Sequence, residues 1–96
     1  MLDLNNLSEL CFKISEKRQK NGDFGKRLNT TENILKHCAT EVVEAMAESE
    51  SEIEFKKELA DIIICVLVIA GMEKIDIEDA ILDCIDKNLK RSEKNV

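Results

Sequence analysis

The chain has 96 residues and a net charge of −6, and 44% of its residues are hydrophobic while only 3% are aromatic. This length suits one small domain, and the apolar content excludes a disordered chain. The acidic balance argues against nucleic acid or an anionic membrane as the main partner. Aliphatic residues dominate and proline is absent, so we expect a single all-α domain over residues 1–96.

The first helix is predicted over residues 6–20 from a stripe of apolar residues at helical spacing. Asn6 with Glu9 three residues later resembles a capping pair, and Asn21-Gly22 suits the end of a helix. The members of the stripe are Leu7, Leu10, Cys11 and Ile14.

A loop is expected to follow over residues 21–29. It contains two glycines and the adjacent cations Lys26 and Arg27. Two interpretations stay open at this point. The loop is either a solvated connector, or a mobile segment that contacts the base or the phosphates of a ligand.

Two further helices are predicted over residues 30–48 and 52–72, joined by a polar, acidic turn. Ser51 and Glu54 have the spacing of a capping box at the start of the later helix. From Leu59 onward that helix is apolar at almost every position. A helix apolar on all sides is buried, and 96 residues bury it incompletely. We therefore expect an obligate oligomer, either a homodimer or a homotetramer.

The last helix is predicted over residues 76–94, and its apolar stripe ends in polar and cationic residues. Asp76 suits the N-cap, while Lys87, Asn88 and Arg91 lie at the far end. These residues either interact with the helix C-terminus in solvent, or bind phosphate. In a four-helix antiparallel bundle, packing against the preceding helix would place them near its acidic half.

Two acidic pairs carry the strongest functional signal. Glu41 and Glu44 precede the acidic turn, and Glu58 and Asp61 follow it, each pair at i, i+3 spacing on one helix face. A hairpin folded about residue 51 would bring the pairs opposite each other. Four carboxylates in one place repel one another unless a hard divalent cation binds them. Asp61 is expected at the entrance of a buried helix, where an unpaired charge is costly.

Other chemistries have little support in the sequence. There is no phosphate-binding P-loop motif. The single histidine, His37, lacks the Glu-x-x-His context of a di-iron site. It orients Glu41 or contacts the substrate, or it is merely structural. The four cysteines form no Cys-x-x-Cys pair, so we expect reduced core residues of a cytoplasmic protein. Oxygen ligands favour Mg²⁺, with Mn²⁺ possible, over zinc.

The acidic pairs, the long apolar helix and Asn88-x-x-Arg91 together resemble the MazG-like all-α nucleoside triphosphate pyrophosphohydrolase superfamily, over roughly residues 28–92. The resemblance implies Mg²⁺ held by the four acids and hydrolysis of a (d)NTP to a (d)NMP and pyrophosphate. It also implies substrate contacts from the end of the last helix and a dimer or tetramer. Thr40 stands where the family usually has a further glutamate.

Two other functions remain open from the sequence. One is a non-catalytic nucleotide-binding or regulatory oligomer that keeps the same fold, which the loss of an acid at Thr40 favours. The other is a structural bundle whose acids are ordinary surface charges. The preferred base and sugar are open, because the base-contacting aromatic residues of the family have no clear counterpart here.

Overall fold

The computed structural model describes residues 3–25 and 29–94, and this part of the chain is helical with short connections and no strand. The all-α prediction is confirmed, and each helix boundary lies within two residues of the predicted one. The helices are α1 (Leu4–Lys20), α2 (Thr31–Ala47), α3 (Glu52–Met72) and α4 (Ile77–Lys94).

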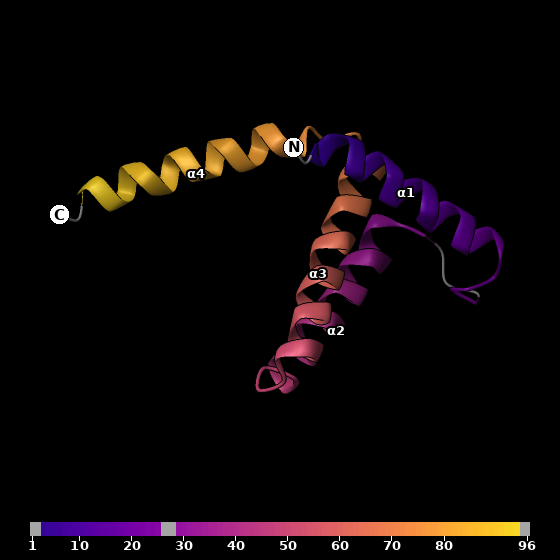
Figure 1. The fold of residues 1–96 in the computed structure, drawn as a ribbon. Helices are drawn as coiled ribbons and strands as arrows, with labels where there is room; N and C mark the ends of the chain where they lie inside the picture. The colour runs from indigo at the N-terminus through magenta and orange to yellow at the C-terminus, as the bar shows by residue number, and fades with distance from the viewer. Residues whose placement is uncertain (1–2, 26–28, 95–96) are drawn as a thin grey trace.

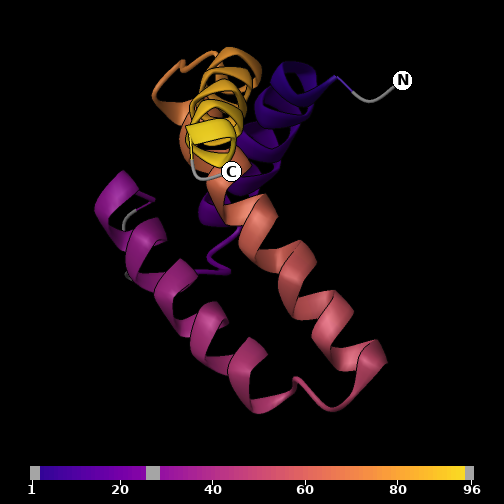
Figure 2. The ribbon, with the colours of Figure 1, turned by 90° about the vertical axis from the view of Figure 1, so that its left-hand side faces the viewer.

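Helices α2 and α3 form an antiparallel hairpin, and α1 packs across the C-terminal half of α3 (Figures 1 and 2). Small and aliphatic side chains form the core between these helices. The buried hydrophobic residues are Ala45, Cys65, Leu67, Val68 and Ala70. The core is thus concentrated on α3, which contacts both other helices. One face of the α2–α3 hairpin therefore faces α1.

The closest approach between α1 and α3 is at Gly71. A Cβ atom at this position would lie 2.4 Å from the carbonyl oxygen of Ser8 and 2.8 Å from the Cβ of Phe12. Only glycine permits this distance, and Ser8 is 2% exposed. Gly71 lies in the last turn of α3, which ends at Met72 as predicted. The function of Gly71 is close helix packing.

The turn after α3 instead uses Lys74, the only non-glycine residue with a positive φ in the described chain, at 56°. The Ile75 amide donates to the Ala70 carbonyl oxygen at 2.9 Å, as in the hydrogen-bonded C-terminal motif that glycine usually completes. A lysine in this left-handed conformation carries strain.

Helix starts follow local hydrogen-bonding chemistry. Asp3, and not Asn6, caps α1, because its carboxylate accepts from the backbone amides of Asn5 and Asn6. Ser51 occupies the N-cap of α3 but makes no side-chain capping hydrogen bond. Asp76 accepts from the backbone amide three residues later, as expected for an N-cap.

Helix α4 does not pack along α3 within the chain, contrary to our expectation of an antiparallel neighbour. Its first turn is held against the start of α1, where Asn5 donates to Asp76 at 2.9 Å and accepts from the Ile77 amide at 3.1 Å. The Leu4 amide also donates to Glu78 at 2.7 Å. From this corner α4 extends away from the hairpin (Figure 1). Its amphipathic sequence specifies an apolar face but not what covers that face.

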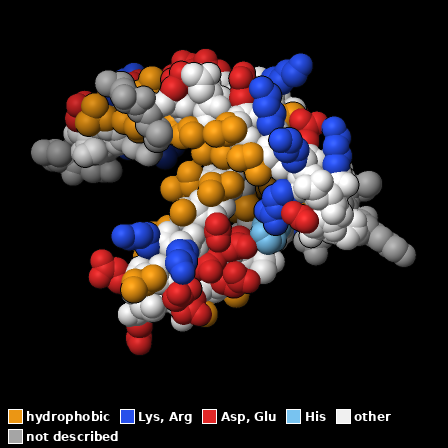
Figure 3. All heavy atoms as spheres, turned by 45° about the vertical axis from the view of Figure 1, so that its right-hand side comes forward, with side chains coloured by type: hydrophobic (Ala, Val, Ile, Leu, Met, Phe, Trp, Pro, Cys, Tyr) orange, Lys and Arg blue, Asp and Glu red, His pale blue; other side chains and the backbone are white. Residues whose placement is uncertain are grey.

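Large apolar side chains are exposed on α4 and on the hairpin. Leu82 and Leu89 on α4 are 63% and 57% exposed, and Ile63 on α3, which we expected to be buried, is 58% exposed. Figure 3 shows hydrophobic side chains gathered between the acidic surface and the projecting helix. Cys84 is also exposed, which corrects the expectation of four core cysteines, although all four are free thiols.

Within the described residues, no helix is both long and apolar enough to cross a membrane.

Candidate functional site

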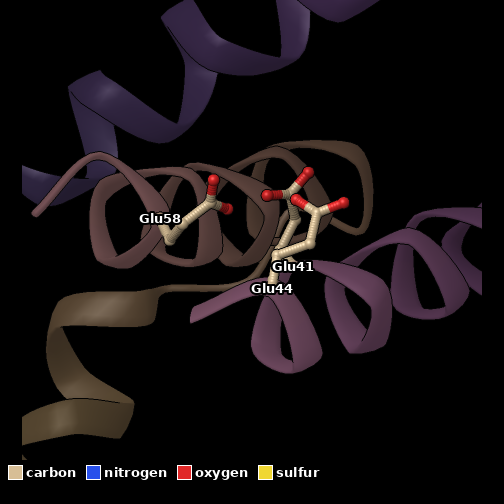
Figure 4. Close-up of side chains that lie close together, drawn as sticks. All are labelled: Glu41, Glu44 and Glu58. Carbon is tan, nitrogen blue, oxygen red and sulfur yellow. The ribbon is translucent and has the colours of Figure 1, made fainter. Parts of the chain in front are cut away.

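Three of the predicted carboxylates converge between the two helices of the hairpin. One carboxylate oxygen from each of three residues lies within 4.8 Å of the other two. The residues are Glu41 and Glu44 on α2 and Glu58 on α3. Figure 4 shows the three side chains meeting from the two helices. Glu41 is 8% exposed, Glu58 is half-buried and Glu44 is exposed. The hairpin register inferred from the spacing of the acids therefore brings these carboxylates together.

Asp61 lies one turn beyond Glu58 and is exposed, so the expected burial of its charge is wrong. Its carboxylate is outside the three-carboxylate cluster, which we define as Glu41, Glu44 and Glu58. It still acts on that cluster, because its charge helps to raise the pKa of Glu58. Asp61 and Glu41 both line the cavity described below.

The electrostatics of the cluster favour a bound cation. The pKa of Glu58 is raised by hydrogen bonding to the Glu41 carboxyl, then by desolvation and by the charges of Glu41 and Asp61. Only a hydrogen bond with Glu44 lowers this pKa. One oxygen of Glu58, Oε2, is buried without a hydrogen-bond partner. Carboxylates that repel one another, with one buried oxygen that has no donor, are suitable ligands for a hard divalent ion. These residues fit such an ion.

His37 lies one helical turn before Glu41 and contacts it. The distance from His37 Nε2 to Glu41 Oε1 is 3.0 Å, and the His37 side chain is 50% exposed. This contact orients the buried carboxylate and places the imidazole at the edge of the cluster. Figure 3 shows the histidine beside the acidic surface.

Thr40, at the position of the missing family acid, is exposed and donates from its hydroxyl to the Lys36 carbonyl oxygen at 3.3 Å. Its side chain therefore bonds within its own helix and does not join the carboxylates.

A cavity of about 520 Å³ opens beside the carboxylates, between α1, the segment after it and the hairpin. The hairpin wall includes His37, Glu41 and Asp61, while the opposite wall includes Arg18 and Phe24. Sequence reasoning missed Arg18 and Phe24. The available signal was weak: Phe24 is one of three aromatic residues and lies between two glycines in the loop.

The remaining candidate residues are not at this site within one chain. Lys87, Asn88 and Arg91 lie on the exposed, distal part of α4, which leads away from the carboxylates (Figure 1). Lys26 and Arg27 lie outside the described residues.

The fold is therefore an all-α hairpin that gathers carboxylates from both of its helices next to a cavity of ligand size, an arrangement whose oxygen ligands suit a divalent cation. A family model for the MazG nucleotide pyrophosphohydrolase domain matches residues 27–96. The chain belongs to this family. Comparisons with curated proteins and with solved structures gave no match. Helix α1 and the turn after it lie before the matched segment.

Proposed function

We propose that the protein is a Mg²⁺-dependent nucleoside triphosphate pyrophosphohydrolase, which converts a (d)NTP and water into a (d)NMP and pyrophosphate. The observation that carries this proposal is the convergence of Glu41, Glu44 and Glu58, with a buried Glu58 oxygen that has no partner. Membership of the MazG family supports it. Mn²⁺ has the same preference for oxygen ligands and is the alternative metal.

The cluster would hold the cation, with Asp61 as a further ligand or as an acceptor for a coordinated water. When bound, the cation neutralises phosphate charge and lowers the pKa of a water molecule. The chain itself contributes orientation: the contact with His37 fixes Glu41, and the hairpin fixes the positions of the acids. In the reaction, water would cleave the anhydride between the α- and β-phosphates: its oxygen bonds to one of the two phosphorus atoms, the bridging oxygen leaves with the other, and a proton is released to solvent.

We further propose that the protein acts as a homodimer or homotetramer in which α4 of one copy approaches the hairpin of another. Lys87, Asn88 and Arg91 cannot meet the carboxylates along the path that α4 takes in its own chain. Their charges complement an acidic hairpin, and the apolar stripe of α4 is exposed. A second copy would cover this stripe and supply phosphate-binding groups.

Activity is tested with a panel of (d)NTPs and modified nucleotides, by measuring pyrophosphate and monophosphate in the presence of Mg²⁺. We expect turnover of at least one triphosphate, loss of turnover with chelator, and a decrease of orders of magnitude in Asp61→Asn. Full activity of a folded Asp61→Asn variant would contradict the site assignment. Nucleotide binding without turnover across the panel would instead indicate a non-catalytic nucleotide-binding oligomer.

Assembly is tested by sedimentation of Leu89→Glu against Lys90→Gln. Both residues are exposed on α4, and both substitutions shift the net charge by −1, but only Leu89 lies on the apolar face, since Lys90 is on the opposite, polar face. We expect Leu89→Glu to dissociate the oligomer and lower activity, with Lys90→Gln close to the native protein. A native protein that sediments as a monomer would refute the proposed assembly.

A further inference from the structure

We infer that α1 and the turn after it form the nucleoside-binding wall of the site, with the Arg18–Phe24 pair as the platform on which the base stacks. This inference rests on the proposed function and goes further, because it assigns base stacking to two residues, Arg18 and Phe24, that lie before the family-matched segment. The ligand class is a nucleotide with a planar base, bound through its base and its sugar.

The position and size of the cavity are the first support. The cavity is continuous from Glu41 and Asp61 on the hairpin to Arg18 and Phe24 on the opposite side. Its volume of about 520 Å³ lies within the range of roughly 300–1,000 Å³ of small-molecule sites. A triphosphate held at the carboxylates would therefore have its nucleoside portion in this cavity. A smaller cavity of about 320 Å³, lined by Asn33, Lys36, His37 and Thr40, includes none of the acids.

The geometry of Arg18 and Phe24 is the second support. The guanidinium carbon of Arg18 lies 5.1 Å from the centre of the Phe24 ring. Its Nε atom is 3.3 Å from Asp23 Oδ2, which holds the guanidinium in place. Bases stack on aromatic rings and on guanidinium planes, and such contacts tolerate different bases. The guanidinium thus lies over one face of the Phe24 ring, and this pair in the cavity lining offers its outer face to a base.

Polar groups in the same wall can read the edge of a base. Ser15, which is 8% exposed, donates from its hydroxyl to Asn29 Oδ1 at 3.0 Å. This bond ties α1 to the residue just before α2 and fixes an amide side chain at the cavity. An asparagine amide carries both donors and acceptors, as a base edge does. Together with the stacking surface, these groups give the wall the chemistry of a base-binding site.

A direct test uses Phe24→Trp, because the chain has no Trp or Tyr and the new indole is its only strong fluorophore. With Mg²⁺ and a non-hydrolysable triphosphate analogue, we expect saturable quenching as the base stacks on the indole. Inorganic tripolyphosphate has no base and should compete without quenching. Phe55→Trp is the matched control, since Phe55 lies on α3 and does not line the cavity. It should give no quenching with either ligand.

A second test compares Phe24→Ala and Phe24→Leu with the native enzyme. Loss of base stacking on alanine substitution corresponds to a roughly 5- to 140-fold loss of affinity, so we expect KM to rise by this factor while kcat changes less. Preference among bases should flatten, and inhibition by tripolyphosphate should be unchanged. Leucine keeps the apolar bulk but not the ring, so Phe24→Leu should resemble Phe24→Ala.

The outcomes separate this inference from the proposed function. Turnover without quenching, together with native KM values in both Phe24 variants, would overturn the assignment of the base wall and leave the enzyme assignment standing. Equal quenching by tripolyphosphate would also overturn it, because the wall would then bind phosphate. Base-dependent quenching without turnover of any triphosphate would support the assignment of the nucleoside-binding wall and refute the proposed enzymatic function.

Discussion

The substitution Gly71→Ala tests how closely α1 must approach α3. The new Cβ would lie 2.4 Å from the Ser8 carbonyl oxygen, so α1 has to retreat by at least 0.6 Å to reach the 3.0 Å below which such contacts are essentially unknown. Overpacking of this kind costs about 1–3 kcal/mol, which includes the dispersion contacts that weaken when α1 moves away from α3. The higher helix propensity of Ala than of Gly offsets this by about 1 kcal/mol.

We therefore expect a net loss of up to about 2 kcal/mol in the free energy of unfolding. For a domain of this size, that lowers the melting temperature by up to roughly 16 °C. The measurement is thermal unfolding followed by circular dichroism at one fixed protein concentration, since an oligomer's stability depends on concentration.

The matched control is Ala60→Gly, at an exposed position of the same helix. It should lose only the helix-propensity difference of about 1 kcal/mol. If Gly71→Ala stabilises the protein by as much as Ala60→Gly destabilises it, the tight contact between α1 and α3 does not exist, and the reasoning fails.

Three further predictions concern charge, thiol chemistry and the turn after α3. Because the pKa of Glu58 is raised in the fold, its charge destabilises the metal-free protein at neutral pH. Glu58→Gln should therefore raise the melting temperature of the metal-free protein and remove the further rise that Mg²⁺ causes. It should also lower turnover more than about 100-fold. Desolvation, with smaller effects of neighbouring groups, raises the pKa of the Cys65 thiol to about 11. At pH 8 only about 0.1% is thiolate, so a thiol reagent should modify the exposed Cys84 long before Cys65, and equal rates in the folded protein would contradict the burial. Lys74→Gly should stabilise by about 0.5–1 kcal/mol in chemical denaturation, because glycine adopts the positive φ without strain; a destabilised variant would show that the turn is not strained.

The helices could be predicted because their signals are local. Apolar periodicity and turn residues depend on neighbours within a few positions, and this placed α3 at residues 52–72 as observed. The spacing of the acids also predicted a hairpin that brings the two acidic pairs opposite each other, and three of the four carboxylates do meet. Hydrogen-bonding partners of caps were less predictable, as Asp3 shows, because several polar residues near a helix start can compete for the same amides.

The direction of α4 and the exposure of Asp61 could not be predicted, because both depend on what covers an apolar face. An amphipathic stripe on α4 shows that a partner is favourable, but the pattern is the same whether the partner is its own chain or another copy. Likewise, the apolar residues around Asp61 suggested burial, yet α3 is covered on only part of its circumference within one chain. The contribution of Phe24 to the cavity depends on contacts between distant segments, which no short-range pattern records.

The corner that joins α1 to α4 has a mechanical consequence. Asn5 bonds to Asp76 and to the Ile77 amide, and so it fixes the angle at which an 18-residue helix leaves the rest of the chain. At 1.5 Å per residue this helix is about 27 Å long, so a rotation of about 10° at the corner moves its far end by roughly 5 Å. A small change at this corner therefore becomes a large displacement at the far end of α4. The Asn5 side chain helps to determine where Arg91 and its neighbours lie. Substitutions at this corner can therefore redirect α4 without changing any carboxylate.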